Sequence, residues 1–278
     1  SARLAPKASV IVDGGGALPL CDLIADVRLE ALGRGEWLVR VGGTAAEAKM
    51  LGKGDAHGAT NAAIRVLRVL AGQGPEARGR DLDAGALREL AAGLDTAGAM
   101  PAAPPRLPVG RFALKGGGFA RGFALPFGQI DADALASLAQ AAGADGELRL
   151  APGRGLLALN DDPALTETAR RLGLVAQADD PRLRIAACAG SPACASARLP
   201  ARAIARSLAA SWPAAGPALH VSGCAKQCAK PAGPAVVLIG GPEGYRIAAE
   251  GTAIGAAARA LLARVAQAHG AHPQRHRA

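Results

Sequence analysis

The chain has 278 residues, of which 50% are hydrophobic, 20% are charged and only 3% are aromatic. This length suits one large domain or two modest ones, and the composition excludes a largely disordered or fibrous chain. No apolar run approaches the ~18 residues of a membrane span, and the opening residues lack the apolar core of a signal peptide, so we predict a cytoplasmic protein without a membrane partner.

The charge of the chain indicates the chemistry of its ligand. Lys and Arg outnumber Asp and Glu by 32 to 23, which gives a net charge of +9 and favours a polyanionic partner. Binding of single-stranded nucleic acid depends on aromatic rings for base stacking, and aromatic residues are scarce here. We therefore expect a polycarboxylate ligand and no nucleic acid.

The first part of the chain, residues 1–98, is predicted to form an α/β lobe that carries no metal ligands. Its apolar runs predict strands at 9–14, 26–32 and 36–43, and helical spacing of Ile64, Leu67 and Leu70 predicts a helix over 59–71. A second helix is expected from the capping residue Asp83 to about Leu94. Four prolines then crowd the stretch 99–109, which we interpret as a linker between domains.

The rest of the chain is predicted to form two further parts and a tail. Residues 110–181 suggest two strands joined by a turn at Gly116–Gly118, a helix from Asp131, a strand pair over 147–159 and a helix over 163–174. Residues 182–270 suggest strands at 183–190 and 219–224, a helix over 200–210, a hairpin over 235–251 and a final helix from Thr252. We expect the tail, 271–278, to be disordered, and the fold class to be α+β.

Four of the five cysteines form two closely spaced pairs. Five residues separate Cys188 from Cys194, and three separate Cys224 from Cys228. Four thiolates at strand ends and turns are typical of an iron–sulfur cluster. A structural zinc ion is an alternative, although the first spacing exceeds its usual two to four residues, and disulfides are a further alternative that the lack of a secretory signal disfavours. Cys21 stands alone and is predicted to be a small core residue.

The cysteine pattern also resembles a known superfamily. C-x5-C, followed about thirty residues later by G-C-x3-C, is similar to the motif of the sulfite and nitrite reductases. Within that superfamily, the segments APKASVIVDGGG, ELRLAPGRGLL, CAGSPACASAR and LHVSGCAKQCAKP resemble the precorrin-3B synthase family of aerobic cobalamin biosynthesis, over most of the chain. The sirohaem reductases usually carry Asn in the second cysteine pair, where this chain has Lys226.

The resemblance implies a fold of nitrite/sulfite reductase-like lobes with a ferredoxin-like half-domain at 110–181. It implies that Cys188, Cys194, Cys224 and Cys228 hold a [4Fe-4S] cluster in the lobe 182–270. The implied activity is a monooxygenase that hydroxylates precorrin-3A with dioxygen and forms a lactone, with electrons from an external donor. An additional non-haem iron is compatible with that chemistry. The alternatives are a sirohaem-dependent sulfite or nitrite reductase and a truncated, non-catalytic iron–sulfur module.

The resemblance also suggests residues that bind the substrate, a tetrapyrrole with several carboxylates. Arg149 and Arg154 match positions where the family places basic residues against these carboxylates, which guanidinium groups bind in a bidentate manner. Lys226 and Lys230 flank the second cysteine pair and suit the same role. The alternative for all four is a solvated surface charge. The sequence identifies no catalytic residue.

Family members carry a further ferredoxin-like half-domain ahead of the segment that begins here at Ala5. We interpret this sequence as N-terminally truncated. All four cysteines follow the missing part, so we expect the chain to assemble its cluster but to be a poor catalyst by itself.

Overall fold

The computed structural model describes residues 3–98, 100–144, 146–213, 216–231 and 233–274. The chain divides into two compact units, Ser1–Arg106 and Leu107–Ala278, and the division lies within the stretch 99–109 that its prolines mark as a linker. Each unit is described by itself. None of the described helices is long and apolar enough to cross a membrane.

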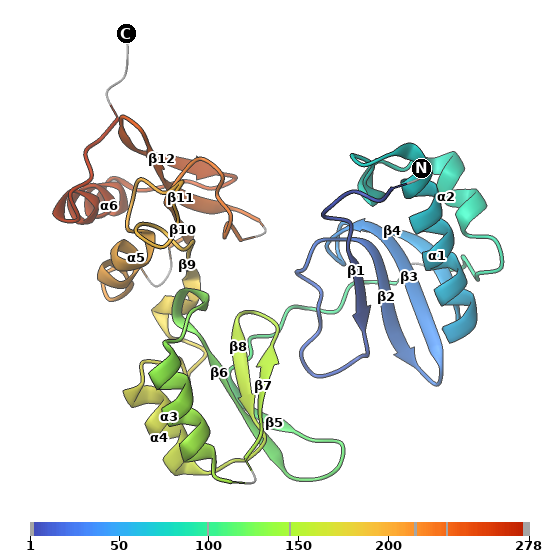
Figure 1. Ribbon diagram of the computed structural model, residues 1–278, viewed down its shortest axis with the longest axis horizontal. Coiled ribbons are helices and arrows are strands. Elements are labelled where there is room, and N and C mark those ends of the chain that lie inside the picture. Colours follow the sequence, from blue (N-terminus) through green and yellow to red (C-terminus); the bar gives the residue numbers. More distant parts are fainter. Residues whose placement is uncertain (1–2, 99, 145, 214–215, 232, 275–278) are drawn as a thin grey trace. The chain divides into compact units, whose positions relative to one another are not determined.

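The first unit is a four-stranded sheet with helices on one face (Figure 1). Its strands β1 (Val10–Asp13), β2 (Ala25–Gly33), β3 (Glu36–Gly43) and β4 (Lys49–Asp55) lie in chain order, with β1 parallel to β2 and the other pairs antiparallel. The helices are α1 (Ala56–Gln73), α2 (Ala84–Leu90) and the short η1 (Gly79–Asp81). The sequence did not predict β4, because glycines are uncommon within strands and β4 contains two. Gly52 is required there by close packing, since a Cβ at this position would lie 2.7 Å from Cβ of Leu94.

The helices of this unit begin at capping aspartates. Asp55 accepts from the Gly58 amide at 2.7 Å, so α1 begins three residues before the predicted start, while Asp83 accepts from Ala86 at 2.8 Å, as predicted. On α1, Val66 and Leu70 are buried but Ile64 is 39% exposed, so the predicted apolar stripe was partly wrong. The second helix ends at Leu90 instead of Leu94.

The second unit contains two sheets. The first has the order β5-β6-β8-β7, all antiparallel, from β5 (Gly110–Ala113), β6 (Phe119–Ala124), β7 (Leu148–Ala151) and β8 (Gly155–Ala158). The predicted glycine turn is confirmed, since the Leu114 amide donates to Gly118 at 3.2 Å. Helices α3 (Ala132–Ala142) and α4 (Pro163–Arg171) cover one face, and the turn η2 (Pro126–Gly128) follows β6.

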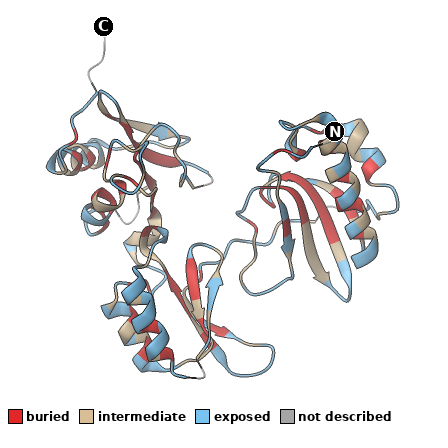
Figure 2. Cartoon of the chain, viewed as in Figure 1, coloured by how far each residue is buried: buried red, intermediate tan, exposed pale blue. Residues whose placement is uncertain are grey.

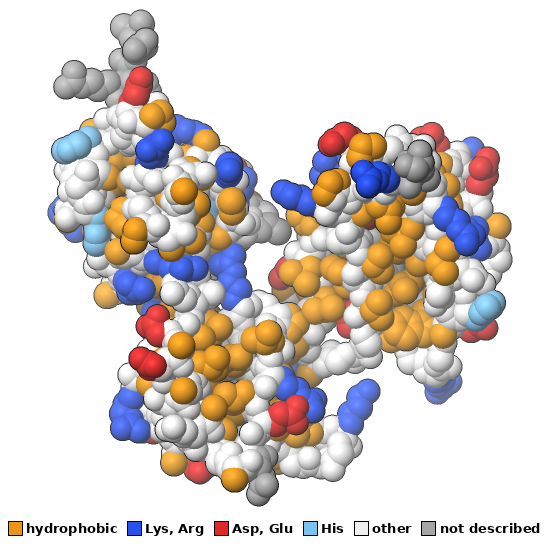
Figure 3. Space-filling view, in the orientation of Figure 1, with side chains coloured by type: hydrophobic (Ala, Val, Ile, Leu, Met, Phe, Trp, Pro, Cys, Tyr) orange, Lys and Arg blue, Asp and Glu red, His pale blue; other side chains and the backbone are white. Residues whose placement is uncertain are grey.

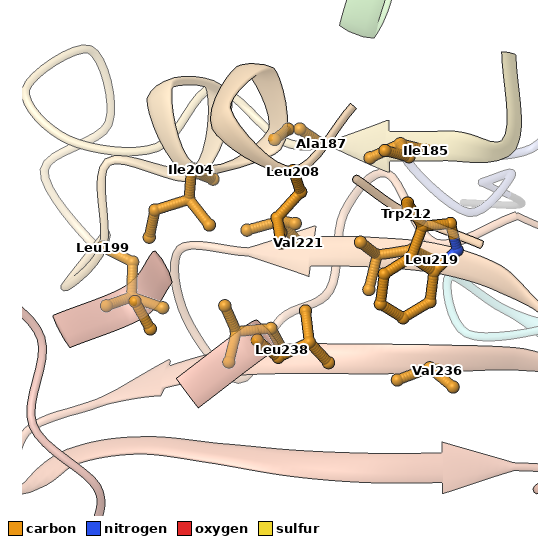
Figure 4. Close-up of a cluster of buried hydrophobic side chains, with 14 of the residues drawn as sticks. Ile185, Ala187, Leu199, Ile204, Leu208, Trp212, Leu219, Val221, Val236 and Leu238 are labelled. Atoms are coloured by element: carbon orange, nitrogen blue, oxygen red, sulfur yellow. The ribbon is translucent and has the colours of Figure 1, made fainter. Parts of the chain in front are cut away.

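The second sheet has the order β12-β11-β10-β9. Its strands are β9 (Ile185–Ala187), which follows the turn η3 (Pro181–Arg184), β10 (Ala218–Ser222), β11 (Ala235–Gly241) and β12 (Gly244–Glu250); β9, β10 and β11 are parallel and β12 is antiparallel. Helices α5 (Ala201–Ala209) and α6 (Ala256–Ala268) pack on one face. Buried residues concentrate in the strands (Figure 2), and Figure 4 shows Ile204 and Leu208 of α5 above Val221 and Leu238 of the sheet.

Two details of the C-terminal part differ from the sequence-based expectation. The last helix is capped by Gly255, not by Thr252, because residues 251–254 are not helical and Ile254 packs on the core. In the stretch 271–278, which was expected to be disordered, Tyr245 donates to the carbonyl of His272 at 2.7 Å and accepts from the amide of Gln274 at 2.8 Å. Residues 275–278 lie outside the described residues.

A buried ion pair ties the segments of the first unit together. Asp26, which is 2% exposed, accepts two hydrogen bonds of 2.9 Å from the Arg78 guanidinium, and further bonds from the amides of Gly79 at 2.9 Å and Ser9 at 3.0 Å. Burial by itself would raise the pKa of this carboxyl, but the bonds from Arg78, Gly79 and Ser9 outweigh it and the pKa is lowered.

We predict that Asp26→Asn destabilises the first unit by about 3 kcal/mol at neutral pH, because it leaves Arg78 without its charged partner. The folded-state pKa of Asp26 lies below the unfolded value, so this contribution is present at neutral pH and is lost as the pH falls below about 4. Thermal and urea unfolding across this pH range measures both effects. Asp81→Asn is the matched control, since the Arg80–Asp81 pair is exposed; equal losses in the two variants would contradict the prediction.

Candidate functional site

The two cysteine pairs begin at the same edge of the second sheet. β9 and β10 are parallel neighbours, with Ala187 opposite Val221, so their carboxyl ends lie side by side. Cys188 follows β9 directly and donates its amide to the Val221 carbonyl at 3.2 Å. Cys224 follows β10 after a single glycine. Loops beyond the carboxyl ends of parallel strands are a common place for ligand sites.

Glycines let these two loops pack backbone against backbone. A Cβ at Gly223 would lie 2.7 Å from Cβ of Ala197 and 3.2 Å from Cα of Gly190. A Cβ at Gly240 would lie 2.6 Å from the Gly223 carbonyl oxygen. The Arg198 amide donates to that same carbonyl at 2.6 Å, which fastens the first cysteine loop to the second. Larger residues would push the loops apart, so the small residues are a condition of the site.

The thiols are free and differ in exposure. Cys188, Cys194 and Cys224 are half-buried, Cys228 is exposed, and none of the five cysteines is in a disulfide. The Gly223 amide donates to Sγ of Cys188 at 3.0 Å, which is the kind of bond that stabilises a thiolate ligand. Within the described ranges, no three His, Cys, Asp or Glu side chains are close enough together to hold a single metal ion. The lone Cys21 is buried, as predicted, and burial raises the pKa of its thiol.

Three of the four basic residues singled out in the sequence lie at these loops. Arg154, in the β7–β8 turn, donates through Nη2 to the Ala229 carbonyl at 3.4 Å. Lys230 forms an ion pair with Glu250 of β12, and Nζ of Lys226 lies 3.5 Å from Oγ of Ser196 in the first loop. Arg149 instead pairs with Glu147 at 2.6 Å, where both side chains are more than half exposed. Figure 3 shows several Lys and Arg side chains close together on the displayed face of the second unit.

A buried histidine beside these cations was missed in the sequence. His220 lies on β10, and its side chain is on the sheet face opposite the α5 and α6 core, which its neighbours Leu219 and Val221 join. Burial, with added repulsion from Arg154 and Lys230, lowers the pKa of His220 to about 4, so the ring is neutral at neutral pH. Nδ1 lies 3.3 Å from the Ala186 carbonyl and donates to it, whereas Nε2 has no partner in the described part of the chain. The only sign of this buried histidine in the sequence was a polar residue between the apolar residues Leu219 and Val221 of the strand.

A cavity in the first unit does not include any residue singled out for ligand binding. Its volume is about 490 Å³, and most of the residues in its wall are apolar, among them Leu32 of β2, Leu38 of β3 and Pro104. Two of the four charged residues in the wall, Arg28 and Glu30, bond to each other at 2.9 Å. Their mutual pairing is a structural role, so we place the candidate site at the cysteine loops.

Comparison of the chain with known proteins finds a similar sequence and a similar structure that bear on its function. No protein-family model matches it. It is 37% identical over 267 residues to a curated precorrin-3B synthase from a Sinorhizobium species, a match that covers 91% of this chain and 58% of that protein. The structure of the NirA protein of Mycobacterium tuberculosis is similar with a TM-score of 0.60 and 20% identity, over 82% of this chain and 51% of that one. The chain thus spans little more than half the length of either relative. The resemblance predicted from the cysteine motifs is confirmed: this chain is similar to a precorrin-3B synthase over most of its length, and it shares the α+β fold of NirA.

Proposed function

We propose that this chain forms the part of a precorrin-3B synthase-like enzyme of cobalamin biosynthesis that holds an iron–sulfur cluster and one wall of the tetrapyrrole site. The observation that carries the proposal is that the two cysteine pairs start directly after adjacent parallel strands, Cys188 after β9 and Cys224 one residue after β10. The similarity to a precorrin-3B synthase selects this reaction from those that the fold supports.

The residues at the two loops fit a [4Fe-4S] cluster. Four thiols suit its four irons, one to each, and such a cluster does not need three ligands packed around one ion. Gly190, Gly223 and Gly240 leave out the side chains that would separate the loops, and the Gly223 amide already points at a sulfur. When bound, the cluster would supply electrons to the reaction from an external donor. Cys188, Cys194, Cys224 and Cys228 would be its ligands.

The basic residues at the loops would bind the carboxylates of the tetrapyrrole. Arg154 has guanidinium N–H groups left over beyond its long contact with Ala229, and Lys226 has a mostly exposed ammonium group. Bidentate bonds from Arg154 would orient the ring system relative to the second cysteine loop. His220 stays neutral at neutral pH, so its ring does not repel the cations beside it. In this role the chain's own residues bind and orient the substrate.

The proposed reaction is the hydroxylation of precorrin-3A followed by closure of a lactone. One atom of dioxygen enters the substrate and the other leaves as water, so each turnover takes up two electrons and two protons. The protein would be cytoplasmic and would need a separate electron donor. An additional non-haem iron would be consistent with this chemistry, but the described residues do not single out its ligands.

A sirohaem-dependent sulfite or nitrite reductase is the second candidate, because NirA shares the fold. Lys226 favours the synthase, since the reductases usually carry Asn in the second cysteine pair. The bound tetrapyrrole separates the two: a reductase retains sirohaem through purification, whereas a synthase releases its product.

We predict that the chain purified without oxygen is brown and contains about four iron and four sulfide per molecule. Cys194→Ser and Cys228→Ser should each abolish the colour and most of the iron, because each removes one of four ligands. Cys21→Ser, at the remaining cysteine, should retain both. Iron, sulfide and zinc analyses make the measurement. One zinc per chain without sulfide would establish the zinc alternative.

We also predict that metal-free uroporphyrin, a tetrapyrrole with several carboxylates, binds the chain and that salt weakens the binding. Arg154→Gln should raise the Kd about tenfold, because a charge-assisted bond to a carboxylate is lost. Arg264→Gln at an exposed position on α6 removes the same single charge and is the control. Fluorescence titration measures the Kd. A sharp haem-like absorption band in the purified protein would instead assign the chain to the sirohaem reductases.

A further inference from the structure

A second cavity lies away from the cysteines, on the helical side of the second sheet. Its volume is about 230 Å³, and it is formed by η2, the start of α3, the end of α4 and one face of α5. Phe127, Ile130 and Leu174 contribute apolar wall, and none of the four paired cysteines lines it. This volume is below the roughly 300–1,000 Å³ of sites for drug-sized ligands, so it suits a small molecule.

Two arginines on α5 reach this cavity without partners. Arg202 and Arg206 both line it and are one helical turn apart, which places them on the same face of α5. Nε of Arg202 is buried and has no hydrogen-bond partner, and neither guanidinium forms an ion pair within the described parts of the chain. A buried donor without an acceptor is costly, so this arrangement calls for an acceptor that the chain does not provide.

The other charges at the cavity leave it positive. Arg182 is committed, since it bonds to Asp180 and donates to the Gly173 carbonyl at 2.7 Å. Asp131 lines the cavity and caps α3 without a side-chain hydrogen bond to the helix, and no ion pair joins it to Arg202 or Arg206 among the described residues. One carboxylate therefore faces two unpaired guanidinium groups.

Core packing holds the apolar wall in place. Phe127 is buried and packs with the core under α5, although its φ of 57° lies in the left-handed region that bulky residues avoid. Such a conformation persists only where the surrounding packing holds it. The cavity therefore combines a packed apolar wall with cationic groups.

We propose that this cavity is a binding site for a small carboxylate with an apolar body, held by Arg202 and Arg206 at its carboxylate and by Phe127 and its neighbours at its body. Guanidinium groups recognise oxyanions in general, and phosphate shares this chemistry. The apolar wall favours the carboxylate, because a phosphate ion has no apolar surface to bury. The site is independent of the cysteine loops and of the function proposed for them.

The test is a calorimetric titration of the full chain with benzoate, acetate and inorganic phosphate. We expect benzoate to bind with a Kd of about 1 mM or below, and acetate and phosphate to bind at least tenfold more weakly. Arg202→Gln and Arg206→Gln should each raise the Kd for benzoate at least fivefold. Arg259→Gln on α6, an exposed arginine outside the cavity, should leave the Kd unchanged.

A variant that is expected to strengthen benzoate binding keeps the test informative if the arginine variants fold poorly. Asp131→Asn removes the one repulsive carboxylate and should lower the Kd for benzoate about threefold. Benzoate binding no tighter than acetate binding would overturn the proposal, because the wall would then contribute nothing. Tighter binding of phosphate than of benzoate would also overturn it, and so would arginine variants that fold but bind benzoate like the original chain.

Discussion

The parallel pairing of β9 with β10 is the constraint on which the second unit depends. Its register sets Ala187 opposite Val221, and it therefore brings Cys188 and Cys224 to one edge. The same register sends Leu219 and Val221 into the core under α5 and α6 while His220 takes the opposite face. A slip of one residue would exchange these faces, burying the histidine in the apolar core and moving the cysteines out of step. Core packing thus enforces the geometry of the cysteine loops.

The sheet separates two chemically different regions. On one side of it, α5 and α6 close an apolar core, and the outer face of α5 carries Arg202 and Arg206 toward a small cavity. On the other side, His220 lies beneath a loop that Glu250 holds through Lys230. The short helix α5 follows the first cysteine loop, packs on the core through one face and lines the cavity with Arg202 and Arg206. The same helix therefore contributes to the core and to the cavity wall, and it is joined directly to the first cysteine loop.

Local signals predicted the parts of this structure that depend on neighbours in sequence. The cysteine spacings, the capping Asp83 and the glycine turn at Gly116–Gly118 are short-range patterns, and the last two are confirmed by hydrogen bonds. Strand β4 was not predicted, because its Gly52 is explained by close packing against Leu94, a residue far along the chain. The cavity at Arg202 was not predicted either, because its wall depends on contacts between segments that are distant in sequence, from Pro126 to Arg206, and that share no motif.

The cations at the cysteine loops are not equally available to a carboxylate ligand. The pKa of Glu250 is lowered, first by its hydrogen bond from Lys230, so the carboxylate stays ionised and competes with any ligand for that ammonium group. Arg149 is in the same position with respect to Glu147, whose pKa its hydrogen bond also lowers. Among the described residues, the Arg154 side chain has only the long contact with a neutral carbonyl, which costs little to give up. If the loops bind a polycarboxylate, Arg154 should therefore contribute more to the affinity than Arg149 or Lys230, because its guanidinium has no carboxylate to leave.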